Sequence, residues 1–195
     1  MRTCLFGFLA GVLLLLGSAC SAPQPPDFRP TATVKDIMDS VVDPNADFLW
    51  DSVEIVVTAN GTEEKAPKTD DDWRDVRRHA IALIEATNLL LVPGRHIAQR
   101  GEKADDPKVE LGPEQIEALV TQDRASWTMF SHGLHDAAME SLKAINAKDA
   151  KGLLNSGDGL DRACESCHLK YWYPNESKGK LRQEAQGQNN DKEKK

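Results

Sequence analysis

The stretch Cys164-Glu165-Ser166-Cys167-His168 lies near the end of the sequence and is its most specific feature. Its two cysteines are three residues apart, and a histidine directly follows the second. On a helix, residues at this spacing lie within about one turn of each other. Each thiol can then add to one vinyl group of a haem, while His168 turns its imidazole towards the iron. The C-x-x-C-H pattern therefore predicts one covalent haem c, held by Cys164 and Cys167 with His168 as an iron ligand.

A cysteine pair can also hold zinc or carry out thiol redox chemistry. A structural zinc site needs four ligands, and the only other cysteines, Cys4 and Cys20, lie in or next to the N-terminal leader. A thioredoxin-like pair is expected at the start of a helix after a strand, within a β-α-β pattern that this sequence does not display. Haem is therefore the favoured interpretation of the motif, with zinc and a redox pair as the alternatives. No cysteine outside the motif remains for a structural disulfide in the folded part.

Residues 1–19 have the features of a signal peptide. Arg2 supplies a positive start, and residues 5–16 form an apolar run too short to span a membrane as a helix. Small residues follow at positions 17–19. We therefore expect the chain to be exported to the periplasm.

The cysteine that follows this leader indicates a lipid anchor. Residues 16–20 resemble a bacterial lipobox, in which the cysteine becomes the lipidated first residue of the mature protein. We expect lipidation of Cys20, with membrane contact through this anchor only. Cleavage near Ala19 or Ala22 to a soluble product remains the alternative.

The charge of the chain restricts its partners. The sequence has 24 Lys+Arg against 31 Asp+Glu, a formal net charge of −7. Such a surface is a poor match for nucleic acid. We expect redox partner proteins of the cell envelope that present a basic patch, with an association that weakens as the salt concentration rises.

Helical periodicity dominates the stretch between the leader and the tail. Residues 20–32 form a Pro-rich tether, residues 33–173 one domain, and residues 174–195 a charged tail that we expect to be disordered. Four segments carry apolar residues at helical spacing, namely 34–53, 70–91, 113–146 and 148–171. No convincing strand is visible, although the state of residues 53–58 stays open and 59–68 is expected to be loop. The pattern predicts an all-α antiparallel four-helix bundle with haem near the C-terminal helix.

The helix boundaries have local signals of their own. Thr33 and Asp36 form a capping-box pattern before the first helix, and Thr69 precedes three aspartates at the start of the second. Asp43-Pro44 is expected to kink or restart the first helix, because proline lacks the backbone donor. Pro113 opens the third helix.

A mostly helical exported domain with C-x-x-C-H in its last helix resembles cytochrome c′ and the wider class II c-type cytochromes. The residues that carry the resemblance are Ala144 to Asp149, leading into Leu160 to His168. The resemblance implies thioethers at Cys164 and Cys167, His168 as proximal ligand, and a distal side that faces the first helix. The Asp43-Pro44 interruption, the long loop before Pro113 and the ending from Tyr171 to Pro174 depart from the family pattern. A homodimer and gas binding therefore stay open.

The residue opposite His168 decides between two functions. In the family, a methionine on the first helix gives a six-coordinate electron carrier, whereas an apolar residue leaves a five-coordinate iron that binds NO or CO. Met38 lies on the apolar stripe of that helix and is our expected sixth ligand, with plain core packing as the alternative. The other candidate ligands lie on the third helix and are more typical of boundary positions: Met129, His132, His135 and Met139.

We therefore expect a one-electron carrier, with a gas-binding haem module as the alternative. An enzyme is not expected, because no distal acid–base constellation can be assigned. Arg162 is a candidate partner for a haem propionate, although a solvated arginine on an acidic helix would have the same sequence.

Overall fold

The computed structural model describes residues 27–59 and 61–175, and this part of the chain is mostly helical. The predictions for the signal peptide, for Cys20, for residues 20–26 of the tether and for residues 176–195 of the tail lie outside the described residues. The elements in chain order are α1 (Val34–Ile37), the π-helix η1 (Met38–Val42), α2 (Asp43–Asp51), β1 (Glu54–Thr58), β2 (Gly61–Lys65), α3 (Asp70–Leu89), α4 (Pro113–Gln122), α5 (Arg124–Asn146) and α6 (Ala150–Tyr171). In the described ranges, no helix is both long and apolar enough to cross a membrane.

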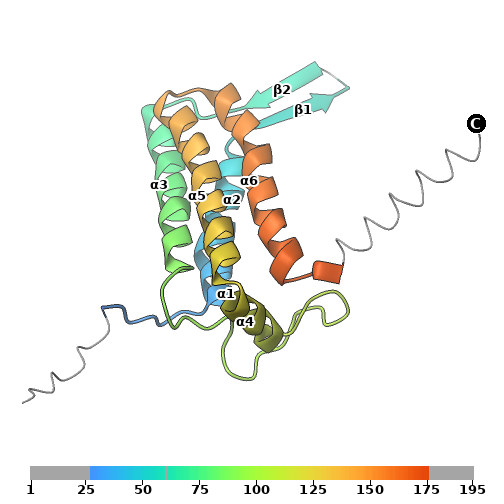
Figure 1. The fold of residues 1–195 in the computed structure, drawn as a ribbon. Coiled ribbons are helices and arrows are strands. Elements are labelled where there is room, and N and C mark those ends of the chain that lie inside the picture. Colours follow the sequence, from blue (N-terminus) through green and yellow to red (C-terminus); the bar gives the residue numbers. More distant parts are fainter. Residues whose placement is uncertain (1–26, 60, 176–195) are drawn as a thin grey trace, which may run out of the picture.

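The long helices run side by side (Figure 1). Helix α5 packs against both α3 and α6, and α2 packs against α3. Short helix α4 lies at the end of the molecule where α6 terminates (Figure 1). The interior between these helices is apolar, and its largest fully buried side chains include Leu83, Ile116, Trp127, Leu160 and Tyr171. Burial of such side chains is the main favourable term for the fold.

The predicted capping box at Thr33 is present, and the predicted cap at Thr69 is also a capping box. The Thr33 amide donates to the Asp36 carboxylate at 2.8 Å, and the Asp36 amide donates to the Thr33 hydroxyl at 3.1 Å. Thr69 and Asp72 repeat the arrangement at the start of α3, with distances of 2.9 and 3.1 Å. Each box provides acceptors for amides that a helix start leaves without an intrahelical partner.

The segment from Val34 to Asp51 stays helical throughout, but it is not a single α-helix. The expected interruption at Asp43-Pro44 takes the form of the π-helical turn η1, which ends directly before these two residues. The Asp43 amide donates to the carbonyl of Met38, five residues earlier. A π-turn is a local widening that absorbs one additional residue without ending the helix.

The prediction of a single helix over 113–146 is wrong, because the segment forms two helices, α4 and α5, separated at Asp123. This residue has φ −131° and ψ 63°, outside the helical range, and its carboxylate accepts the Ser126 amide at 3.0 Å. Asp123 is therefore the N-cap of α5. The apolar stripe continues across the break, so periodicity alone gave no sign of it.

The prediction of a purely helical domain also needs correction at residues 54–65. Strands β1 and β2 form an antiparallel hairpin with Val56 opposite Glu63, and Gly61 has a φ of +128°. The β-branched run of β1 favours a strand, and glycine adopts this positive φ without the steric cost of a side chain. The hairpin projects from the end of the molecule opposite α4 (Figure 1), and every residue of its two strands is exposed.

Candidate haem site

Helix α6 presents the C-x-x-C-H motif in its last two turns. The Asp149 carboxylate accepts the Gly152 amide at 2.9 Å and caps the start of the helix, which ends at Tyr171. Cys164 and Cys167 are both half-buried, and neither forms a disulfide. The two thiols and His168 are thus supplied by one rigid element.

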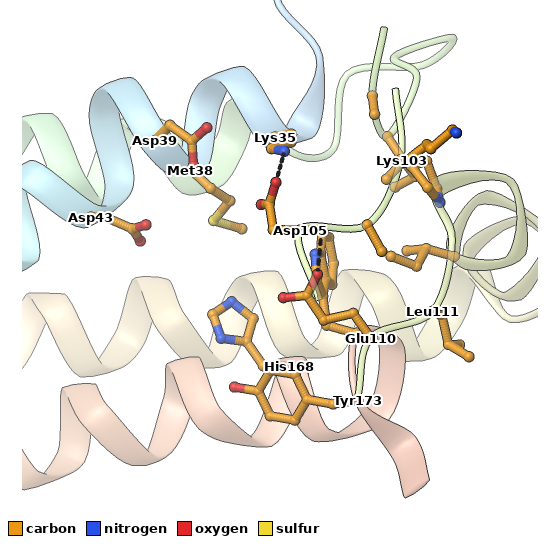
Figure 2. A pocket seen from close by; sticks show the side chains of 16 residues that line it. Lys35, Met38, Asp39, Asp43, Lys103, Asp105, Glu110, Leu111, His168 and Tyr173 are labelled. Atoms are coloured by element: carbon orange, nitrogen blue, oxygen red, sulfur yellow. Dashed lines mark hydrogen bonds and ion pairs between the residues drawn. The ribbon is translucent and has the colours of Figure 1, made fainter. Parts of the chain in front are cut away.

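His168 lines a cavity of about 250 Å³ between α6, η1 and the loop that precedes α4. Met38, the first residue of η1, lines the same cavity. Figure 2 shows the Met38 thioether and the His168 imidazole pointing towards each other from opposite sides. The remaining lining residues are Lys35, Asp39, Asp43, Ile97, Ala98, Lys103, Ala104, Asp105, Glu110, Leu111, Pro113, Ile116, Trp172 and Tyr173.

Met38 is the methionine that faces His168 in the described part of the chain. Its residue is only 9% exposed, whereas Met129 and Met139 on α5 are 59% and 42% exposed. Neither of those methionines lines the cavity, and neither do His132 and His135. The structure therefore brings together the predicted pair, Met38 and His168, and keeps the rival candidates on α5 away from it.

The loop between α3 and α4 closes one side of the cavity, a role that its sequence did not predict. The Leu111 amide donates to the Trp172 carbonyl at 2.7 Å, which ties the loop to the end of α6. On the opposite side, Lys35 forms an ion pair of 3.0 Å with Asp105. The loop is polar and turn-rich, and no periodic pattern in it indicated either contact.

Two aromatic residues flank His168. Its ring centroid lies 5.8 Å from that of Trp172 and 5.9 Å from that of Tyr173. The Tyr173 hydroxyl donates to the Glu165 carboxylate at 2.9 Å, which holds the tyrosine ring beside the histidine. Trp172 and Tyr173, two residues of the sequence ending that departs from the class II cytochrome pattern, thus form part of the wall around His168.

Burial sets the protonation states of the motif. It lowers the pKa of His168, against the opposing effect of Asp43, Glu165 and Glu110. The imidazole is accordingly neutral at pH 7 and keeps the lone pair that a metal ligand needs. Burial also raises the pKa of Cys164 to about 11 and that of Cys167 to about 12, so both thiols are protonated at pH 7. Asp43 near the cavity also has a raised pKa, chiefly because of burial.

This set of donors fits a haem c. Helix α6 offers two free thiols one turn apart, which do not line the cavity, and a neutral imidazole directly after the second. A buried thioether lies across the cavity from this imidazole. Histidine with methionine is a standard axial pair for c-type haem. A group of three or more His, Cys, Asp or Glu side chains able to hold a bare metal ion is absent from the described residues.

Arg162 does not join the other predicted site residues. It lines a separate hollow between α5 and α6, together with Ala137, Glu140 and Gly159. The cations that line the His168 cavity are Lys35 and Lys103, which the sequence did not single out.

Known proteins resemble this chain in fold only distantly. Neither the protein-family models nor the curated proteins contain a match. Among solved structures, the chain is similar to a Leu-to-Val variant of cytochrome c prime from Alcaligenes xylosoxidans in complex with nitric oxide, at 18% identity and a TM-score of 0.44, covering 74% of this chain and 99% of that one. It is also similar to a structure described as cytochrome c′, at 17% identity and a TM-score of 0.45, covering 73% and 99%. A ferrous Arg-to-Gln variant of the Alcaligenes protein with bound NO has 17% identity and a TM-score of 0.45, covering 74% and 99%.

Proposed function

We propose that this protein is an exported c-type cytochrome that binds one covalent haem and carries single electrons. The observation that supports this proposal is the position of Met38 and His168 on opposite sides of one cavity. Cys164 and Cys167 precede His168 on the same helix, α6. Cys164 and Cys167 would hold the haem through thioethers, and His168 and Met38 would be the ligands of its iron. When bound, the haem supplies an iron that alternates between the ferrous and ferric states.

Each residue has a role that its surroundings favour. His168 is neutral because burial lowers its pKa, so it can bind iron without first losing a proton. Met38 is nearly buried, and its thioether closes the side of the site opposite His168. Because both ligands stand on helices that pack into one core, electron transfer requires little rearrangement of the protein.

We further propose a carrier rather than an enzyme, working at the periplasmic side of a membrane to which Cys20 anchors it. The acidic side chains beside the site are consistent with a partner that presents lysines and arginines. Asp39 and Asp43 line the cavity, and Asp161 is close enough to Cys164 to help raise the pKa of its thiol. Association with such a partner should weaken as salt increases.

The ferric absorbance spectrum tests the carrier assignment. Wild-type protein should be low-spin, with the near-infrared charge-transfer band of a methionine–iron bond. Met38→Ala should lose this band and bind CO readily, whereas Met129→Ala, at an exposed methionine, should match the wild type. If Met38 served core packing alone, its replacement would cost about 2–5 kcal/mol of stability and leave the spectrum unchanged. A high-spin wild type would instead favour a five-coordinate, gas-binding haem protein.

A further inference from the structure

We infer that Pro44 and Asn45 are positioning residues, which hold the π-helical turn η1 and thereby direct the Met38 thioether towards His168. This inference rests on the proposed function, because it concerns Met38 as an iron ligand. It assigns roles to residues that lie outside the predicted site and line no part of the cavity.

The burial pattern shows why a π-turn is needed here. Ile37 and Val42 are each 2% exposed, although they are five residues apart. In a continuous α-helix, five residues correspond to a rotation of about 140° beyond one full turn, which would place the two side chains on different faces. The additional residue absorbed by η1 brings both onto the core face. Val34 before the turn and Leu49 after it are likewise buried.

Pro44 weakens the competing α-helical arrangement. Its nitrogen carries no hydrogen, so the α-helical hydrogen bond to the carbonyl of Ser40 cannot form. One residue earlier, the Asp43 amide reaches back five residues to the carbonyl of Met38. The missing donor is lost to either kind of helix, but the proline ring also clashes with the carbonyl four residues earlier in an α-helix, and this clash disfavours an α-helix directly at the turn.

Asn45 fastens the turn to the neighbouring helix. Its side-chain amide donates to the carbonyl of Val41 within η1. Its side-chain oxygen lies 2.8 Å from Nδ1 of His79 on α3. The His79 ring is stacked on Phe48, with centroids 3.7 Å apart and planes 13° from parallel. The carbonyl of Val41 is thus linked through Asn45 to a ring that is itself held in place.

The geometry of the turn fixes the direction of Met38. Conversion of η1 to α-helix would remove one residue from the turn and rotate Met38 by about 100° relative to α2, the angle per residue of an α-helix. In Figure 2 the thioether points from η1 towards His168, a direction that such a rotation would change. Met38 ligation should therefore depend on residues that never touch the haem.

Holoprotein of the double variant Pro44→Ala/Asn45→Ala tests this inference, with each single variant measured beside it. Pro93→Ala, at an exposed proline after α3, and Asn88→Ala, at an exposed asparagine of α3, are the matched controls. The readouts are the methionine–iron band, the reduction potential and the fraction of haem that binds CO. A fourth readout, also on holoprotein, is hydrogen exchange at the Asp43 amide, which reports the bond to the Met38 carbonyl directly.

We expect the double variant to lose the band, to have a lower potential and to exchange the Asp43 amide faster, while both controls match the wild type. Asn45→Ala alone should raise the CO-binding fraction by roughly two- to tenfold, the range that one hydrogen bond sets. Helix content by circular dichroism should be retained, because alanine favours a helix more than proline does. If the double variant nevertheless loses helix content, the CO-binding fraction of the single variant Asn45→Ala tests the inference in its place.

Two results separate failure of this inference from failure of the proposed function. A wild-type protein without the methionine–iron band overturns the six-coordinate carrier. A wild type that has the band, combined with folded variants at positions 44 and 45 that keep it at full intensity, overturns the positioning role alone.

Discussion

Met38 and His168 lie on opposite sides of one cavity (Figure 2), although η1 is the second helical element of the chain and α6 is the last. The pairing results from the fold, since each helix packs into the common core with one of these residues directed inward from it. Methionine with histidine is a known ligand pair of c-type haem iron, so this arrangement is the basis of the proposed function. The two cysteines of α6 complete the set on the histidine side.

A pair of glycines on α6 gives a direct test of how α6 packs against α2. Trp50 donates its indole N–H to the Gly157 carbonyl at 3.3 Å, and a Cβ at Gly157 would lie 3.2 Å from the Trp50 ring. At Gly159 the nearest atom would be the flexible end of Arg162, at 4.0 Å. Gly159→Ala should therefore stabilise the protein by about 0.5–1 kcal/mol, whereas Gly157→Ala should gain less or destabilise. Chemical denaturation measures both, and equal gains would contradict the close contact.

The thiols of the apoprotein should be unreactive until the protein unfolds. Burial raises the pKa of Cys164 to about 11 and that of Cys167 to about 12, and the thiolate is the form that reacts with iodoacetamide. At pH 8, alkylation of folded apoprotein should be slower than in denaturant by about two to three orders of magnitude, with Cys164 the faster of the two. Mass spectrometry of timed samples gives the rates. Equal rates in the folded and unfolded protein would show that the motif is not buried.

The N-cap of α5 should contribute to acid stability. Asp123 has a pKa lowered to about 2, first by its hydrogen bonds with Ser126 and then by Lys170 at 3.0 Å. Because the pKa in the folded state is lower than in the unfolded chain, the stabilisation is present above about pH 4 and is lost as the pH falls towards 2. Asp123→Asn keeps a capping side chain but does not titrate. Thermal melts between pH 7 and pH 2 should therefore fall more steeply for the wild type, and parallel curves would contradict this role.

The N-terminal leader predicts processing as a lipoprotein at Cys20. Globomycin should cause the precursor to accumulate in the expressing cells. Cys20→Ser should remove the lipid and prevent recovery of the mature protein with membranes. Normal maturation under the drug, together with a soluble wild type, would support cleavage near Ala19 or Ala22 instead.

Helical periodicity and capping residues made much of this architecture predictable. The ends of α3 and α6 lie close to the expected positions, because Thr69 is a strong cap and the motif continues an apolar stripe. Met38 was identified on the same stripe, and the structure places it opposite His168. Local patterns suffice for these features.

The features that the sequence did not reveal depend on geometry between distant segments. The break at Asp123 interrupts no apolar stripe, and the contact between Leu111 and Trp172 joins a loop without periodicity to the end of α6. Arg162 is different, because helix geometry within α6 alone fixes its position relative to His168. Six residues separate it from His168, so about 240° of rotation beyond a full turn places the two on different sides of α6.

The attachment of haem to Cys164 and Cys167 is the central claim, and the mass of denatured protein tests it most directly. Wild-type protein made in a host with c-type maturation machinery should keep its red colour in denaturant and show a mass increment of one haem. Cys164→Ala/Cys167→Ala should show neither. Complete extraction of haem from the wild type by acid acetone, leaving the mass of the bare chain, would contradict the account.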